Sequence, residues 1–137
     1  MSTDRDRETT LQLALECLAG AGRLRLRVTG ASMLPAIASG SYVLIRRCAA
    51  AEVMPGDVVL AKTADGVRLH RLIEIRGYGT DAWWITRGDN NGYCDPPLSH
   101  ADVLGVLTSV EPPEPATKLA AWRSRLLSAG LHIARAA

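Results

Sequence analysis

Between residues 23 and 110 the sequence divides into short segments of alternating or mostly apolar residues, separated by residues that favour turns. The clearest is 23–28, where arginine alternates with leucine and then valine, which predicts a half-buried strand with its odd positions facing solvent or a polar cleft. Further strands are predicted at 42–47, 57–63, 67–75, 83–87 and 103–110. Short strands with few helices between them indicate a mainly β fold with an antiparallel, partly closed sheet.

Helices are predicted on both sides of this β region. Residues 8–19 place Leu11, Leu15 and Leu18 on one side and end before Gly20, as an amphipathic helix does. The C-terminal segment combines an apolar stripe with arginines off that stripe. The predicted division is an N-terminal helix at 1–21, a β domain at 22–111, a proline-rich linker at 112–115 and a C-terminal amphipathic helix at 116–137.

Composition and charge narrow the class of protein. A chain of 137 residues with 47% hydrophobic and 22% charged residues fits one globular unit. The net charge of +2 is too small to favour nucleic acid as a partner. No run approaches a membrane-spanning length, and the N-terminus lacks the layout of a secretory signal, so a cytoplasmic location is expected. Peripheral membrane contact through the C-terminal helix stays open as an alternative to docking on the domain, and the oligomeric state is unknown.

The cysteines favour neither a disulfide framework nor a metal site. Cys17, Cys48 and Cys94 are odd in number and form no CxxC pair. Reduced thiols are the simpler interpretation, and no cofactor or metal is predicted.

Ser32 is the candidate nucleophile. It follows the strand at 23–28 and is preceded by the small residues Gly30 and Ala31, which leave room for a carbonyl group to approach. A nucleophilic serine needs a base within hydrogen-bond reach and N–H donors aimed at the developing oxyanion. The alternative is a serine that caps a turn before Pro35.

His70 is the candidate base. In the strand at 67–75 the odd-numbered apolar residues share one face, whereas Arg68, His70 and Glu74 share the other. The imidazole is therefore predicted to point away from the main core, where a neutral ring near pH 7 would suit a general base. A surface histidine beside arginine and glutamate is the alternative.

Two aspartates follow in the segment 87–95, which reads Arg-Gly-Asp-Asn-Asn-Gly-Tyr-Cys-Asp. Asp89 lies inside a glycine- and asparagine-rich stretch that is typical of a turn. Asp95 comes six residues later. Either carboxylate is a candidate to orient the imidazole of His70.

Together these motifs resemble the type I signal peptidase and LexA-like serine peptidase superfamily. They are Gly-x-Ser-Met-x-Pro at 30–35, Pro-Gly-Asp-Val-Val at 55–59, His-Arg at 70–71, and Gly-Asp-Asn-Asn at 88–91 with a later Asp, and they span most of residues 22–111. The resemblance implies a serine endopeptidase of the branch that uses histidine as base. Ser32 would be the nucleophile and His70 the base, with Asp95 as orienting carboxylate in preference to Asp89.

The resemblance also implies a substrate site beside Ser32. Backbone groups near Gly30, Ala31 and Met33 would hold the oxyanion and the substrate, since Gly30 stands where signal peptidases carry a serine hydroxyl. A lysine base would have to be Lys62, eight residues before the matching position. No DNA-binding domain is carried over.

We expect an endopeptidase that cleaves a peptide or protein precursor. A catalytically idle peptide-binding module and a membrane-surface accessory protein are the alternatives.

Overall fold

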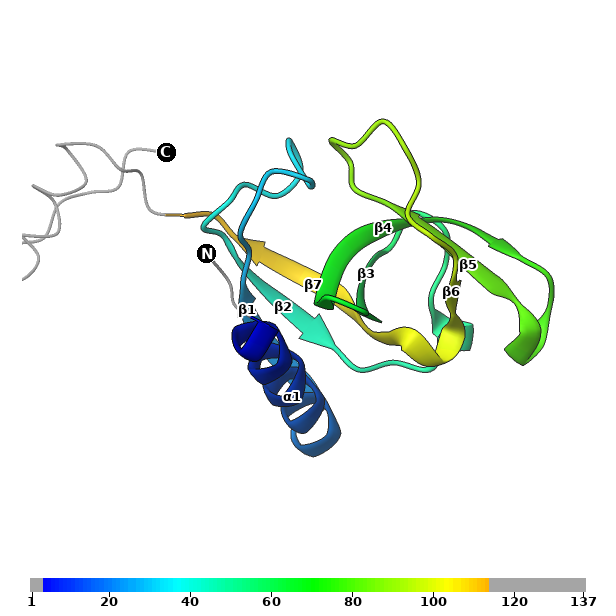
Figure 1. The fold of residues 1–137 in the computed structure, drawn as a ribbon, viewed down its shortest axis with the longest axis horizontal. Coiled ribbons are helices and arrows are strands. Elements are labelled where there is room, and N and C mark those ends of the chain that lie inside the picture. Colours follow the sequence, from blue (N-terminus) through cyan, green and yellow to red (C-terminus); the bar gives the residue numbers. More distant parts are fainter. Residues whose placement is uncertain (1–3, 114–137) are drawn as a thin grey trace, which may run out of the picture.

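The computed structural model describes residues 4–113, which form one α-helix, seven strands and three single-turn 3-10 helices (Figure 1). In chain order the α-helix and the strands are α1 (Asp4–Gly20), β1 (Arg23–Arg27), β2 (Tyr42–Arg46), β3 (Val58–Thr63), β4 (Gly66–Arg76), β5 (Trp83–Arg87), β6 (Leu98–Ser99) and β7 (Val103–Glu111). Five of the predicted strands agree with β2, β3, β4, β5 and β7 to within one residue at each end, and the first agrees with β1. The two-residue strand β6 was not predicted. The predicted C-terminal helix lies outside the described residues.

All seven strands belong to one antiparallel sheet in the order β1-β2-β7-β3-β4-β5-β6. The mainly β, antiparallel prediction is confirmed, but the expected partial closure is wrong, because β1 and β6 end the sheet on opposite sides without pairing. The sheet curves instead at register shifts between β2 and β7, β3 and β7, and β4 and β5. Such bulges bend a strand and increase its twist without joining the edges of the sheet.

The middle of the sheet is buried on both faces. Successive residues of β3 point to opposite sides, as strand geometry requires. Val58 and Leu60 enter one hydrophobic cluster, whereas Val59 and Ala61 enter a second. This is why β3 reads as a continuous apolar run with no alternation.

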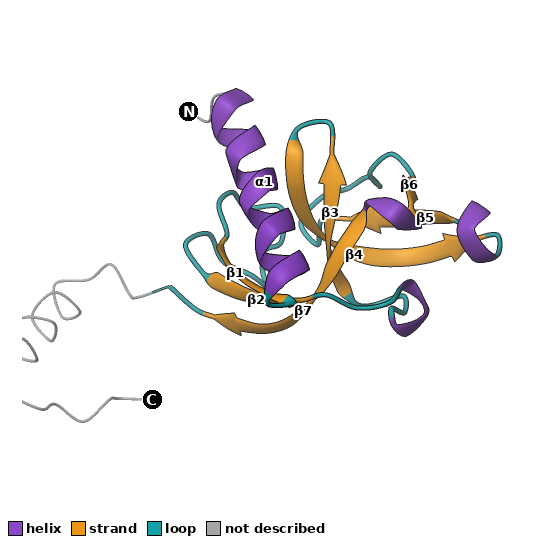
Figure 2. Cartoon of the chain, turned by 90° about the horizontal axis from the view of Figure 1, so that it is seen from below, coloured by secondary structure: helices purple, strands orange, loops and turns teal. Residues whose placement is uncertain are grey.

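Helix α1 lies against the first cluster and contacts β1, β4 and β7 (Figure 2). The helix is confirmed, but its buried stripe differs from the predicted one, because Ala14 and Leu18 are buried whereas Leu15 is 36% exposed. Residues 14 and 18 are four apart and therefore share one face of a helix. Within the described residues, no helix is long and apolar enough to cross a membrane.

A bulge in β4 changes which side chains face inward. The register against β5 shifts between Leu72 and Glu74. Ile73, predicted to share the core face, is therefore 37% exposed, and Leu72 is fully buried. His70 lies before the bulge, so the predicted orientation away from the cluster of Leu69 holds.

Gly105 allows β7 to pass closely beside β2, and its replacement by alanine tests this packing. A Cβ atom at residue 105 would lie 2.7 Å from both the carbonyl oxygen of Arg46 and a methyl group of Ile45. We predict that Gly105→Ala lowers the free energy of unfolding by about 1–3 kcal/mol, because a backbone atom must shift. Urea denaturation measures the change.

Gly20→Ala is the matched control, since a Cβ atom there meets no atom within 4 Å. It should leave stability unchanged or slightly raised. Equal losses in the two variants would contradict this account of the β2 and β7 contact.

Candidate active site

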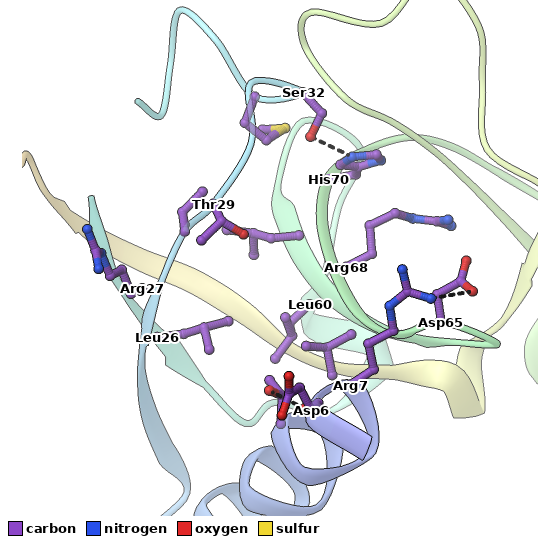
Figure 3. A pocket seen from close by; sticks show the side chains of 15 residues that line it. Asp6, Arg7, Leu26, Arg27, Thr29, Ser32, Leu60, Asp65, Arg68 and His70 are labelled. Atoms are coloured by element: carbon purple, nitrogen blue, oxygen red, sulfur yellow. Dashed lines mark hydrogen bonds and ion pairs between the residues drawn. The ribbon is translucent and has the colours of Figure 1, made fainter. Parts of the chain in front are cut away.

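Ser32 lies in a tight turn that follows β1. The turn is closed by two backbone hydrogen bonds, from Leu34 N–H to the Ala31 carbonyl and from Ile37 N–H to the Met33 carbonyl. Met33 and Ile37 are 2% and 1% exposed and belong to the first hydrophobic cluster. Burial of these two side chains anchors the turn and leaves the hydroxyl of Ser32 facing the cleft (Figure 3).

The loop after β5 holds this turn from the other side. Asn90 donates from its backbone N–H to the Ser32 carbonyl at 2.8 Å and from its side chain to the Ala31 carbonyl at 3.1 Å. Gly88 lets the two backbones come this close, because a Cβ atom there would lie 2.7 Å from the Ser32 carbonyl oxygen. The Gly-Asp-Asn-Asn motif thus forms the predicted turn and also positions the candidate nucleophile.

His70 lies on β4 opposite Val59 and is 5% exposed, so the surface alternative for this histidine is wrong. Its Nε2 atom lies 3.0 Å from the Ser32 Oγ atom, and its Nδ1 atom lies 2.6 Å from the Asp95 Oδ2 atom. Figure 3 shows the imidazole facing the serine hydroxyl. The structure therefore brings Ser32, His70 and Asp95 together in one hydrogen-bonded chain.

This arrangement determines how the imidazole is used. An ionised carboxylate only accepts hydrogen bonds, so the proton of a neutral ring lies on Nδ1 and is donated to Asp95. The Nε2 atom then carries a lone pair toward the hydroxyl of Ser32. A ring held in this form can accept the serine proton, which is what a general base requires.

Asp95 is fixed by contacts that sequence reasoning did not find. Its Oδ2 atom also accepts a hydrogen bond from the Thr86 hydroxyl at 2.8 Å, and its backbone N–H donates to the Thr86 carbonyl at 2.8 Å. Thr86 is 1% exposed. The available signal was a threonine inside the apolar strand 83–87, a position where a buried hydroxyl needs a partner.

Asp89, the other predicted carboxylate, has a different partner. Both of its oxygens accept hydrogen bonds from the Arg71 guanidinium, at 2.8 Å each. This hydrogen bonding lowers the pKa of Asp89 and raises the pKa of Arg71. Arg71 also donates to the Gly56 carbonyl, so the pair ties β4 to the loop after β5 and to the turn before β3.

Of the remaining predicted residues, Gly30, Ala31 and Met33 lie next to Ser32, whereas Lys62 lies outside the cleft. Gly30 adopts a φ of +86°, which favours glycine, and with Ala31 it leads into the Ser32 turn. Met33 borders the cleft, although its buried side chain packs in the first cluster. Lys62 pairs with Val67 on the β3–β4 hairpin and does not line the cleft that contains Ser32.

A cleft of about 320 Å³ leads to Ser32 and His70. Its apolar lining comes from β1, from the residue after β1, and from β3 and β4, namely Leu26, Val28, Leu60, Val67 and Leu69. The N-terminal end of α1 closes it, with Asp6, Arg7 and Thr10 among the lining residues. Arg7 forms an ion pair with Asp65 of the β3–β4 turn. The lining of the cleft is therefore mixed, with apolar side chains beside polar and charged ones such as Thr29, Asp65 and Arg68.

Comparison with known families agrees with this geometry. The model of the Peptidase S24-like family matches residues 1–108. The chain therefore belongs to this family, consistent with the resemblance to LexA-like and signal peptidases. No curated protein was found to match the chain. Family and fold define a serine peptidase-like protein.

Gly88 offers a direct test of how the site is positioned. A Cβ atom at residue 88 would also lie 3.1 Å from the His70 Nε2 atom. We predict that Gly88→Ala displaces the Ser32 turn and lowers any activity of this serine by at least about tenfold, since small misplacements weaken catalysis strongly. Gly92→Ala in the same loop meets no atom within 4 Å and should have little effect. Equal activities of the two variants would contradict the proposed clamp.

The Arg71–Asp89 pair predicts a pH dependence of stability. Folding lowers the pKa of Asp89, so ionised Asp89 stabilises the folded state. This stabilisation is fully present above the pKa of Asp89 in the unfolded chain. It is lost as the pH falls through the pKa of Asp89 in the folded protein. Asp89→Asn should lower the free energy of unfolding at pH 7 by about 1–2 kcal/mol.

The variant should also lose stability less steeply than the wild type below about pH 4, near the ordinary pKa of aspartate. Chemical denaturation at pH 7 and at several values below 4 measures both effects. Parallel pH profiles for the two proteins would count against this role for Asp89.

Proposed function

We propose that the protein is a serine endopeptidase that cleaves a peptide or protein precursor. The single observation that carries the proposal is the chain of hydrogen bonds from Ser32 through His70 to the buried Asp95. Nucleophile, base and orienting carboxylate are the three groups that acyl transfer by a serine requires. Membership of the Peptidase S24-like family supports the same reaction class.

In the proposed reaction each of the three groups has one role. His70 accepts the proton of Ser32 at Nε2 while the Ser32 oxygen attacks the peptide carbonyl. The resulting imidazolium is stabilised by Asp95 and returns its proton to the leaving amine. Water, activated by the same imidazole, then releases the acyl group and regenerates the hydroxyl.

Backbone N–H groups are the proposed oxyanion donors. In the turn at 31–37 the N–H groups of Leu34 and Ile37 are used by hydrogen bonds, whereas no acceptor in the described chain takes those of Ser32 and Met33. These two are therefore available to a developing oxyanion. Gly30 adds no hydroxyl, and its positive φ disfavours a residue that would supply one.

Free strand edges beside the cleft favour an extended substrate. β1 ends the sheet, and residues 66–70 of β4 pair with β3 alone, because the pairing with β5 begins at Arg71. A peptide laid along such an edge gains backbone hydrogen bonds and places alternate side chains on the cleft floor.

Single substitutions test the proposal. Wild-type protein is incubated with synthetic peptides of mixed sequence, and the products are identified by mass spectrometry. We predict that Ser32→Ala and His70→Ala abolish cleavage, and that Asp95→Asn lowers its rate by a factor on the order of 10³ to 10⁴, because the wrong imidazole tautomer is favoured.

Ser109→Ala, which removes an exposed hydroxyl on β7, is the control and should cleave like the wild type. Cleavage that persists in the Ser32 or His70 variant would overturn the proposed site.

A further inference from the structure

Arg68 lies two residues before His70 on β4 and reaches the same carboxylate. Its Nε atom is 3.6 Å from Asp95 Oδ2, the oxygen that accepts hydrogen bonds from His70 and Thr86. This separation permits an ion pair but is too long for a hydrogen bond. The Nε atom is buried and has no hydrogen-bond partner within the described part of the chain. A buried donor of this kind calls for an explanation.

We propose that Arg68 is a positioning residue whose positive charge sets the pH range over which His70 can serve as base. This inference rests on the proposed function. The nearby cation favours ionised Asp95, which keeps the carboxylate an acceptor for the Nδ1 proton. The same cation opposes a second proton on the imidazole. In the proposed role, the charge of Arg68 thus favours the form of the ring that presents its Nε2 lone pair to Ser32.

The other charged residues that line the cleft lie on α1, at the exposed end of β1 and on the β3–β4 turn, namely Asp6, Arg7, Arg27 and Asp65, and Arg7 pairs with Asp65. Arg71 of β4 and Asp89 of the following loop neutralise each other in a bidentate ion pair. Arg87 lies at the exposed end of β5, where solvent screens its charge. Thr86 and Ser32 are uncharged. Arg68 is the cation in ion-pair contact with the oxygen that holds the ring.

The surroundings of Arg68 argue against a purely structural role. Its side chain is 28% exposed and lies between two hollows, the cleft of Ser32 and a neighbouring one of about 470 Å³. Replacement by a neutral residue of similar length removes the charge.

The test is a titration of the His70 imidazole by nuclear magnetic resonance on the full chain. The chain has three histidines, so the His70 signal is assigned by its loss in His70→Gln. We predict that Arg68→Gln raises the pH midpoint of this signal by about 0.5–1 unit, the size expected for removing one charge near a buried group. Arg68→Lys keeps the charge and should restore most of the wild-type midpoint.

Arg23→Gln removes the same charge at the end of β1 away from the cleft and is the matched control. An unchanged midpoint in Arg68→Gln, or an equal rise in Arg23→Gln, would overturn the inference. If Arg68→Gln does not fold, Arg68→Met is measured instead. Loss of folding in both variants would show that Arg68 acts by packing, and would also overturn the inference.

The titration does not depend on turnover. A raised midpoint in Arg68→Gln together with a wild type that cleaves no peptide would support the role of Arg68 and contradict the peptidase proposal. Cleavage by the wild type, with an unchanged midpoint in Arg68→Gln, would support the peptidase proposal and contradict the role of Arg68.

Discussion

The buried hydrogen bond between His70 and Asp95 decides what the site can do. At 2.6 Å from a carboxylate that can only accept, the Nδ1 atom must carry the ring proton, and the Nε2 atom faces Ser32 with a free lone pair. Both partners are less than 10% exposed, so water competes weakly for the bond. Two hydrogen bonds between Asp95 and Thr86, one to the carboxylate and one from the backbone N–H of Asp95, keep the carboxylate in this position.

The fold supplies this geometry by burying both faces of its central strands. One cluster anchors the Ser32 turn through Met33 and Ile37, and the other lies on the face of β4 that carries His70. The Ser32 turn and the face of β4 that carries His70 are therefore supported by different clusters. The Gly88 loop joins them, because only a residue without a side chain fits between the Ser32 carbonyl and the imidazole.

Much of this could be predicted from local patterns. The alternation at 23–28 and the turn signals between segments predicted the strands. The motifs that resemble the signal peptidase and LexA-like superfamily indicated Ser32, His70 and Asp95, which the structure brings together. The predictions that were wrong, partial closure of the sheet and the core-facing position of Ile73, depended on how distant segments pair. The open sheet and the bulge after Leu72 follow from how strands pair, which periodicity does not encode. Thr86 and Arg68 gain their roles from contacts with Asp95 across the fold.

We propose that the hydrogen-bonded chain from Ser32 to Asp95 makes the Ser32 hydroxyl nucleophilic. The most direct measurement is reaction of the full chain with a fluorophosphonate probe, followed by mass spectrometry to locate the adduct. The account predicts one adduct on the wild type, located at Ser32, and none on a His70→Ala variant that remains folded. A wild-type Ser32 that stays unmodified, or one that reacts equally well without His70, would contradict it and would favour an idle peptide-binding module.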